Sequence, residues 1–293
     1  MQTPVSIIII AADSGPSLRE CVLRALASSV PVEVIVADNG SRDGVPQALA
    51  RACENDARVR VLYNHANLGF GPAVNRAAHK ANGNALLVLN PDCMLDGDTL
   101  ARLLDVLATH PGAGVVGVVV CSDDGTPDPA SRRRDPLLRR SLNQMSGRAA
   151  REAEDPKFEG VNVPGPIPDK LIEAENISGA LMLLPRAAFD HLQGFDEGYF
   201  LHCEDLDLCR RARDAGYQVL LAGDVRVHHG KGGSSRHRPV FVSYHKHRGM
   251  WRWFRKFDPA ARKPLTRAVV WCGLTGHFFV SAPKLWLRRA TRH

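Results

Sequence analysis

An adjacent pair of carboxylates has the residue types and position that acid–base chemistry requires. Glu204 and Asp205 stand at the start of a predicted helix, after a loop that contains Gly198 and two aromatic residues. Acidic residues stabilise the N-terminal end of a helix, which explains Glu204 by itself. The adjacent pair after such a loop is better explained by a general base with a carboxylate beside it.

A second group of side chains follows two predicted strands and has the types of a metal site. Asn90 and Asp92 are separated by one residue at a strand end, where an oxygen-bearing side chain and a carboxylate can hold Mg²⁺ or Mn²⁺ against a diphosphate. His228 and His229 follow the last predicted strand, and an imidazole there can complete such a site. On spacing alone, a turn before a helix and a pair of surface histidines stay open as alternatives.

The loops after the other strands suit a nucleotide. Asp38 ends the second strand, where a carboxylate can accept hydrogen bonds from a base or from ribose hydroxyls, although residues 38–41 are also typical of a turn. Gly69 and Gly71 open a helix, which allows close backbone approach and offers a positive helix end to a phosphate. Residues 11–15 lack the GxGxxG pattern and a basic residue, which disfavours a dinucleotide fold of the usual kind and a nucleotidyltransferase.

The elements that must position these groups alternate along the first 120 residues. Short apolar runs predict strands at 5–11, 32–37, 58–63, 84–90 and 113–120, and helical spacing predicts helices at 17–28, 44–56, 72–82 and 98–109. Nearly continuous apolar strands that alternate with helices indicate a mostly parallel sheet covered on both faces.

The pattern changes in the second part of the chain. Residues 122–175 show little periodicity and are predicted to form a long, partly mobile excursion over one end of the sheet. Residues 268–283 are apolar but shorter than the ~20 residues that span a bilayer, so we expect an interfacial or re-entrant helix. The remaining predictions are a strand at 177–184, a helix at 204–215, strands at 217–222 and 225–228, and a basic helix at 244–257.

Composition excludes several classes of protein. Of the 293 residues, 44% are hydrophobic, so the chain is globular rather than disordered. Seven cysteines without a CxxC pair predict buried thiols in a reducing compartment, and the N-terminus shows no secretory signal. Residues 226–293 contain 16 Lys or Arg, one acidic residue and all four Trp. Such a basic, aromatic tail favours an anionic membrane surface over nucleic acid, because no nucleic-acid motif accompanies it.

Taken together, the motifs resemble the inverting glycosyltransferases of family 2, and among them the rhamnosyltransferase-like branch. The resemblance covers about residues 4–257 and rests on eight motifs in register: the apolar first strand, residues 36–41, 67–75, 89–92, 178–180, 194–200 and 204–211, and Gly216-Tyr217. It implies an α/β GT-A nucleotide-diphospho-sugar transferase fold, with a mostly parallel central sheet, helices on both faces and a basic helical C-terminal tail. The implied catalytic domain is 1–243, with a nucleotide-binding half at 1–120 and an acceptor and catalytic half at 121–243; a Trp-rich extension follows at 244–293.

The resemblance also assigns roles to the candidate residues. Asp205 would be the catalytic base, and Glu204 would support it or contact the acceptor. Asp92 and Asn90 would bind Mg²⁺ or Mn²⁺, with Asn90 in place of the first Asp of the usual DxD motif and with His228, in preference to His229, as the third ligand. The residues along the nucleotide sugar would be Ala11, Asp13, Asp38, Asn39, Asn67, Gly69, Gly71, Asn75, Asn90 and Asp92.

The implied activity is the transfer of a sugar to a hydroxyl with inversion of configuration. The first choice of donor is dTDP-L-rhamnose, and the acceptor is a glycan or a polyprenyl-diphosphate-linked saccharide in cell-surface polysaccharide synthesis. A UDP-hexose or UDP-hexosamine donor is the alternative, as is a non-catalytic nucleotide-sugar-binding scaffold. We expect a cytoplasmic enzyme in peripheral contact with anionic lipid at the inner face of the plasma membrane, without nucleic acid; a homodimer is compatible with this function.

Overall fold

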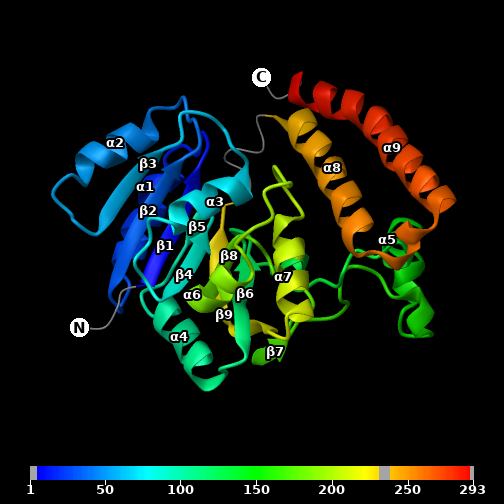
Figure 1. Ribbon diagram of the computed structural model, residues 1–293, viewed down its shortest axis with the longest axis horizontal. Helices are drawn as coiled ribbons and strands as arrows, with labels where there is room; N and C mark the ends of the chain where they lie inside the picture. The colour runs from blue at the N-terminus through cyan, green and yellow to red at the C-terminus, as the bar shows by residue number, and fades with distance from the viewer. Residues whose placement is uncertain (1–4, 231–237, 291–293) are drawn as a thin grey trace.

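A single, mostly parallel sheet runs through the protein (Figure 1), with one antiparallel strand in its middle. The computed structural model describes residues 5–230 and 238–290, with side chains to residue 286. Within these residues nine strands pair in the order β3-β2-β1-β4-β8-β6-β9-β5, and β7 pairs with β9 outside this path. The strands are β1 (Val5–Ala11), β2 (Val32–Asp38), β3 (Val59–Tyr63), β4 (Ala85–Leu89), β5 (Cys93–Met94), β6 (Ala113–Cys121), β7 (Leu171–Glu173), β8 (Leu181–Pro185) and β9 (Gln218–His229).

Helices cover both faces of this sheet, as the sequence predicts. Alternate residues of each central strand point to opposite faces, so Ile7 and Ile9 join one core cluster with α1, α2 and α4, whereas Ile8 and Ile10 join another with α3, α6 and α7. The helices are α1 (Ser17–Leu26), α2 (Val45–Ala52), α3 (Phe70–Ala78), α4 (Thr99–Thr109), α5 (Leu138–Met145), α6 (Arg186–His191), α7 (Glu204–Asp214), α8 (Pro239–Phe257) and α9 (Pro264–Ala290). The predicted α/β architecture is therefore confirmed.

Two strands differ from their predicted form. The strand predicted at 177–184 is β8, which begins only at Leu181 and runs antiparallel to both β4 and β6. The strands predicted at 217–222 and 225–228 are one strand, β9, whose register against β6 shifts between Ala222 and Arg226. The interruption lies at Gly223, where a Cβ atom would come within 1.9 Å of the Pro168 carbonyl oxygen, so a glycine lets the chain pass there.

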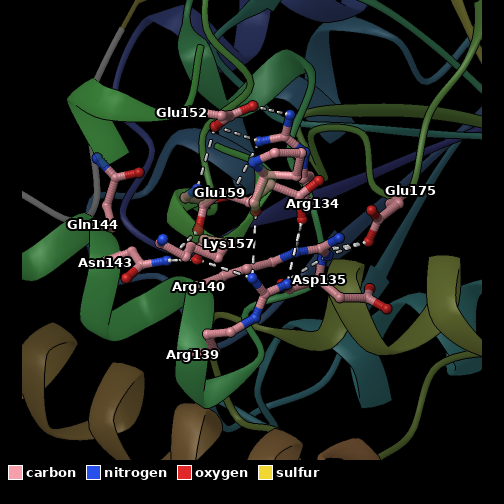
Figure 2. A network of polar contacts seen from close by, with 12 residues as sticks. Arg134, Asp135, Arg139, Arg140, Asn143, Gln144, Glu152, Lys157, Glu159 and Glu175 are labelled. Carbon is pink, nitrogen blue, oxygen red and sulfur yellow. Dashed lines mark hydrogen bonds and ion pairs between the residues drawn. The ribbon is translucent and has the colours of Figure 1, made fainter. Parts of the chain in front are cut away.

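Residues 122–175 are more ordered than the sequence predicts. They contain α5, β7 and three short 3₁₀ helices, and a network of ion pairs connects them (Figure 2). Arg134 pairs with Glu152 at 2.5 Å, and Arg140 pairs with Glu175 at 2.8 Å. Because these partners lie far apart in the sequence, no local pattern reveals them. The network fixes the segment that immediately follows Arg133.

The C-terminal residues form two helices that lie side by side, with α9 on the outer side of α8 (Figure 1). The predicted helix at 244–257 begins earlier, at Pro239, and residues 268–283 are the middle of one continuous helix, α9, which includes Pro283. Lys256 of α8 lies 2.7 Å from Asp196 and 2.6 Å from the fully buried Asp207. These ion pairs attach α8 to α7 and to the loop that precedes it.

The tryptophan and cysteine side chains differ from one another in exposure, and several of the exposed ones lie on α9. Of the four Trp residues, Trp253 is buried in the protein and Trp271 and Trp286 are exposed on α9. Buried thiols were predicted throughout, but Cys272 is exposed on α9 and Cys53 is partly exposed. Among the described residues, none of the helices has the length and apolar character that crossing a membrane requires.

Candidate functional site

A cleft of about 1550 Å³ lies beyond the carboxyl ends of β1, β2 and β4. A volume of this size exceeds that of a pocket for a single small ligand and leaves room for two substrates. Most of the candidate residues line it: Asp13, Asp38, Asn39, Asn67, Gly69, Asn90, Asp92, Glu204 and Asp205. The structure therefore brings together side chains from positions 13 to 205, as the strand-end argument predicts.

One end of the cleft is built from the loops after β1 and β2. Asp38 is buried, and its Oδ1 accepts a hydrogen bond of 2.8 Å from the backbone N–H of Ser41. Asp13 is exposed, and its Oδ1 accepts from the backbone N–H of Arg42 at 2.6 Å. These contacts hold the two loops against each other, with both carboxylates at the cleft.

Asn39 organises the glycine-containing loop before α3. Its Nδ2 donates to Asn67 Oδ1 at 3.0 Å and to the Gly69 carbonyl at 3.1 Å, and its Oδ1 accepts from the Leu68 N–H at 3.0 Å. Gly69 has φ +93°, and a Cβ atom there would lie 2.7 Å from the Phe200 carbonyl oxygen. Only glycine suits this position, because both its dihedral angle and the approach of Phe200 exclude a side chain.

Three candidate residues, Ala11, Gly71 and Asn75, do not line the cleft. Ala11 points into the core, and its carbonyl accepts the Asn39 N–H at 2.7 Å. Gly71 and Asn75 lie one helical turn apart on the face of α3 that packs on Phe195. Asn75 Nδ2 donates to the Phe195 carbonyl at 2.9 Å, and its Oδ1 accepts the Phe195 N–H at 2.8 Å. Both residues therefore serve to pack α3 against the segment before α7.

Asn90 and Asp92, the predicted metal motif, line the cleft, and His229 lies beside them. His229 Nε2 lies 2.9 Å from Asp92 Oδ1 and 3.2 Å from Asn90 Nδ2. His228, which the resemblance favours as the ligand, lies outside the cleft: successive residues of a strand point to opposite sides, and the His228 side chain is exposed and not part of the cleft lining. The pairing of β5 with β9, Cys93 opposite His229, brings the imidazole next to Asp92.

Asp205 lies at the start of α7, where its Oδ1 accepts from the Leu206 N–H at 2.9 Å and its Oδ2 is held by two donors. Its Oδ2 accepts from Arg133 Nη2 at 2.8 Å and from the Gly179 N–H at 3.2 Å. Both side chains are largely buried, and both line the cleft. The sequence analysis does not identify Arg133 as a site residue. The run Arg132-Arg133-Arg134 is apparent in the sequence, but Arg133 and Asp205 are 72 positions apart, so no local pattern indicates their contact.

The turn that presents these carboxylates is strained. His202 and Cys203 have φ of +69° and +71°, a conformation that costs a non-glycine residue on the order of 1–3 kcal/mol. Helix α8 packs closely on this turn at Gly249, where a Cβ atom would lie 2.6 Å from the His202 carbonyl oxygen. The close packing of α8 thus helps to maintain a backbone that α7 alone would not favour.

Glu204 is a buried acid beside Asp205. Its Oε2 has no hydrogen-bond partner, and its side chain lines the cleft. Burial, together with the neighbouring Asp205 carboxylate, raises the pKa of Glu204 from 4.5 to about 8. At neutral pH the site therefore combines a protonated Glu204 with an Asp205 that is paired with Arg133.

Replacing Glu204 by Gln should change how stability depends on pH. Folded protein binds the Glu204 proton more tightly than unfolded protein, so this group lowers the free energy of unfolding as pH rises from 4.5 to about 8. In Glu204→Gln this loss is absent, and the variant should gain stability relative to wild type across that range. Urea unfolding at several pH values measures the difference. Glu54→Gln, an exposed glutamate, is the matched control, and a difference for Glu204→Gln that does not vary with pH would contradict the assignment.

Comparison with known proteins identifies the family. The sequence model described as "Glycosyl transferase family 2" matches residues 6–164. The chain is 30% identical over 285 residues to the N-acetylglucosaminyl-diphospho-decaprenol L-rhamnosyltransferase of Mycobacterium tuberculosis, with 86% of this chain and 88% of the relative covered. It is 24% identical over 225 residues to rhamnosyltransferase WbbL of Escherichia coli K12, with 73% and 79% covered.

Solved structures agree on the fold. A mannosyltransferase from Pyrobaculum calidifontis, in complex with GDP-Man and Mn²⁺, superimposes with a TM-score of 0.61 at 18% identity, covering 100% of this chain and 76% of its own. Staphylococcus aureus TarS residues 1–349, in complex with UDP-GlcNAc, gives 0.59 at 16% identity, covering 95% and 81%. The family match spans more than half of the chain, and the mycobacterial relative aligns over most of both sequences. The chain therefore belongs to glycosyl transferase family 2 and is a glycosyltransferase.

Proposed function

We propose that this glycosyltransferase moves L-rhamnose from dTDP-L-rhamnose to a hydroxyl of a polyprenyl-diphosphate-linked saccharide in cell-surface polysaccharide synthesis. The alignment with a rhamnosyltransferase whose printed acceptor is an N-acetylglucosaminyl-diphospho-decaprenol is the observation that carries the proposal, because it extends over 86% of the chain. The cleft supports it, since strand-end polar groups that suit a nucleotide face a carboxylate that suits an acceptor hydroxyl.

Asp205 is the proposed general base. It accepts the proton of the acceptor hydroxyl, whose oxygen attacks the anomeric carbon from the face opposite the nucleoside diphosphate. A single displacement breaks the bond to the diphosphate and inverts the anomeric configuration. Arg133 and the Gly179 N–H orient the Asp205 carboxylate. Glu204, protonated at neutral pH, lies beside Asp205 in the cleft lining and leaves Asp205 as the ionised carboxylate.

Asp92 and His229 fit a hard divalent cation, Mg²⁺ or Mn²⁺. His229 Nε2 faces two groups with opposite requirements. The Asp92 carboxylate oxygen requires a proton on this nitrogen, whereas the Asn90 N–H requires a lone pair on it, and one nitrogen cannot satisfy both. With the Asn90 amide turned by half a rotation, its oxygen rather than its N–H would face His229 Nε2. Among the described residues no third His, Cys, Asp or Glu joins them, so the donor diphosphate would complete the coordination. Such a cation would neutralise the charge of the leaving diphosphate.

The donor and the base can be tested together. Asp205→Asn should retain stabilisation by dTDP-L-rhamnose in a thermal shift assay and lose about 10²–10⁴-fold in the rate of dTDP release with a saccharide-diphospho-lipid acceptor. Asp214→Asn, on the exposed end of the same helix, is the matched control and should keep both properties. UDP-hexoses and UDP-hexosamines are run in parallel. Selective stabilisation by one of them would replace the proposed donor, and full turnover by Asp205→Asn would exclude the proposed base.

The two adjacent histidines provide the metal test. His229→Ala should raise the Mn²⁺ or Mg²⁺ concentration needed for half-maximal activity by at least about tenfold, because it removes a side chain that binds the cation or orients its ligand Asp92. His228→Ala should leave that concentration unchanged, since its imidazole lies outside the cleft lining. Activity that resists chelation in the wild type would show that no divalent cation takes part, and equal effects of the two variants would reject His229 as the ligand.

The proposal includes peripheral contact with an anionic membrane through α9. Five large apolar side chains of this helix are between 62% and 78% exposed, and at about 100° per residue they fall on one side of it: Leu265, Val269, Phe279, Val280 and Trp286. Exposed cations at Lys263, Arg267 and Lys284 lie on the same helix or next to it. An apolar face accompanied by cations is typical of a helix that lies in the plane of an anionic lipid surface.

Liposome flotation tests this contact. Phe279→Glu should lower the fraction bound to vesicles with anionic lipid at least about tenfold, because it places a carboxylate on the apolar face. Binding of the wild type should also weaken as salt rises. Leu23→Glu, at an exposed apolar position on α1, is the control and should float like wild type. If Phe279→Glu floats as well as Leu23→Glu, α9 is not the contact surface.

A further inference from the structure

A continuous series of aromatic rings connects the catalytic cleft with the exposed face of α9. Phe200 and Phe241 line the cleft. Ring centroids then follow at 4.2 Å from Phe200 to His245, 5.1 Å from His245 to Tyr244, 5.8 Å from Tyr244 to Phe278 and 5.6 Å from Phe278 to Phe279. We call these six residues, Phe200, Phe241, His245, Tyr244, Phe278 and Phe279, the ring track.

Packing between helices does not by itself account for the ring track. Tyr244 and Phe278 join α8 to α9, which explains one contact. Phe241 and Tyr244 nevertheless remain 38% and 48% exposed, and Phe279 is still more exposed. Rings recruited only to hold two helices together would be buried between them. A connected set of rings, three of them exposed and three half-buried, that ends in a cleft is instead typical of a binding surface.

Cations accompany the rings at the cleft end. Arg238 lines the cleft next to Phe241 and Val242. Lys246 lies close enough to His202 to help burial lower the pKa of that imidazole, and Arg248 acts on His245 in the same direction. Helix α8 contains no acidic residue in its sequence. The surface thus suits a molecule with an anionic group near the cleft and a long apolar part that leads away from it.

We propose that the ring track binds the apolar chain of the lipid-linked acceptor, in the part next to its diphosphate, and guides it from the exposed face of α9 to Asp205. The inference rests on the proposed function, in which the acceptor is polyprenyl-linked. It adds the location of the lipid: the saccharide enters the cleft, the diphosphate lies near the cations at the start of α8, and the chain runs over Phe241, Tyr244 and Phe278. Recognition of the chain would then lower KM for long-chain acceptors.

The test compares acceptors that differ only in chain length. The full chain is assayed in detergent without vesicles, with one saccharide-diphosphate carried on a long polyprenyl chain or on a short alkyl chain. Wild type should favour the long chain at least tenfold in kcat/KM, through KM. In Tyr244→Ser that ratio should fall at least fivefold, and Tyr244→Phe, which keeps the ring, should restore it. Leu23→Ser on α1 is the control and should keep the wild-type ratio.

The outcomes separate this inference from the function on which it rests. Two outcomes overturn the ring track and leave rhamnosyl transfer standing. In one, the wild type uses both acceptors with the same kcat/KM; in the other, Tyr244→Ser leaves the ratio of the two kcat/KM values unchanged. No transfer to either acceptor overturns the proposed function instead. A second copy of this chain is the other occupant that the rings could bind, and analytical ultracentrifugation detects it. A dimer that Tyr244→Ser dissociates, with no change in the chain-length ratio, would make these rings a contact between copies and overturn the inference.

Discussion

The reversed direction of β8 is the constraint on which the cleft depends. Because β8 runs antiparallel between β4 and β6, it begins where β4 ends. The Asn90 N–H donates to the Ala180 carbonyl at 2.9 Å, and the neighbouring Gly179 N–H donates to Asp205 at 3.2 Å. Two peptide groups of one short segment therefore connect the proposed metal motif to the proposed base. A parallel strand at the same place would begin at the opposite edge of the sheet and would supply neither contact.

The adjacent carboxyl groups of Glu204 and Asp205 differ in charge, so neither is ionised without a partner. Asp205 is paired with Arg133, and Glu204 is kept protonated near neutral pH by burial and by Asp205. Their different surroundings give two chemically similar residues different roles, a hydrogen-bond acceptor and a hydrogen-bond donor. Arg133 can play its part because the ion pairs of residues 134–175 hold the chain that follows it. The excursion beside the sheet is thus a structural part of the active site.

Much of this arrangement could be predicted from the sequence, and the failures have physical causes. Apolar runs and helical spacing predict the sheet and its two covered faces, and the position of Asp38, Asp92 and Asp205 after strands or at a helix start places them in one cleft. Which of His228 and His229 faces that cleft depends on strand register, which a two-residue histidine run does not define. Asn75 has the residue type of a ligand contact, but the approach of Phe195 makes it a packing residue. Arg133 needed the tertiary fold, because its partner lies on a distant element.

Helix α8 joins the chemistry of the cleft to the surface that α9 exposes. At Gly249 it packs on the strained turn before Glu204, and at Lys256 it is held by Asp196 and by the fully buried Asp207. Asp207 also pairs with Arg211 of α7, so Lys256 joins α8 to an ion pair that α7 already contains. The same helix carries Phe241, which packs on Phe200 at the cleft, and Tyr244, which packs on Phe278 of α9. A displacement of α8 by the proposed lipid chain would therefore act on the turn that presents Glu204 and Asp205, and it would couple binding of the proposed acceptor to the position of the proposed base.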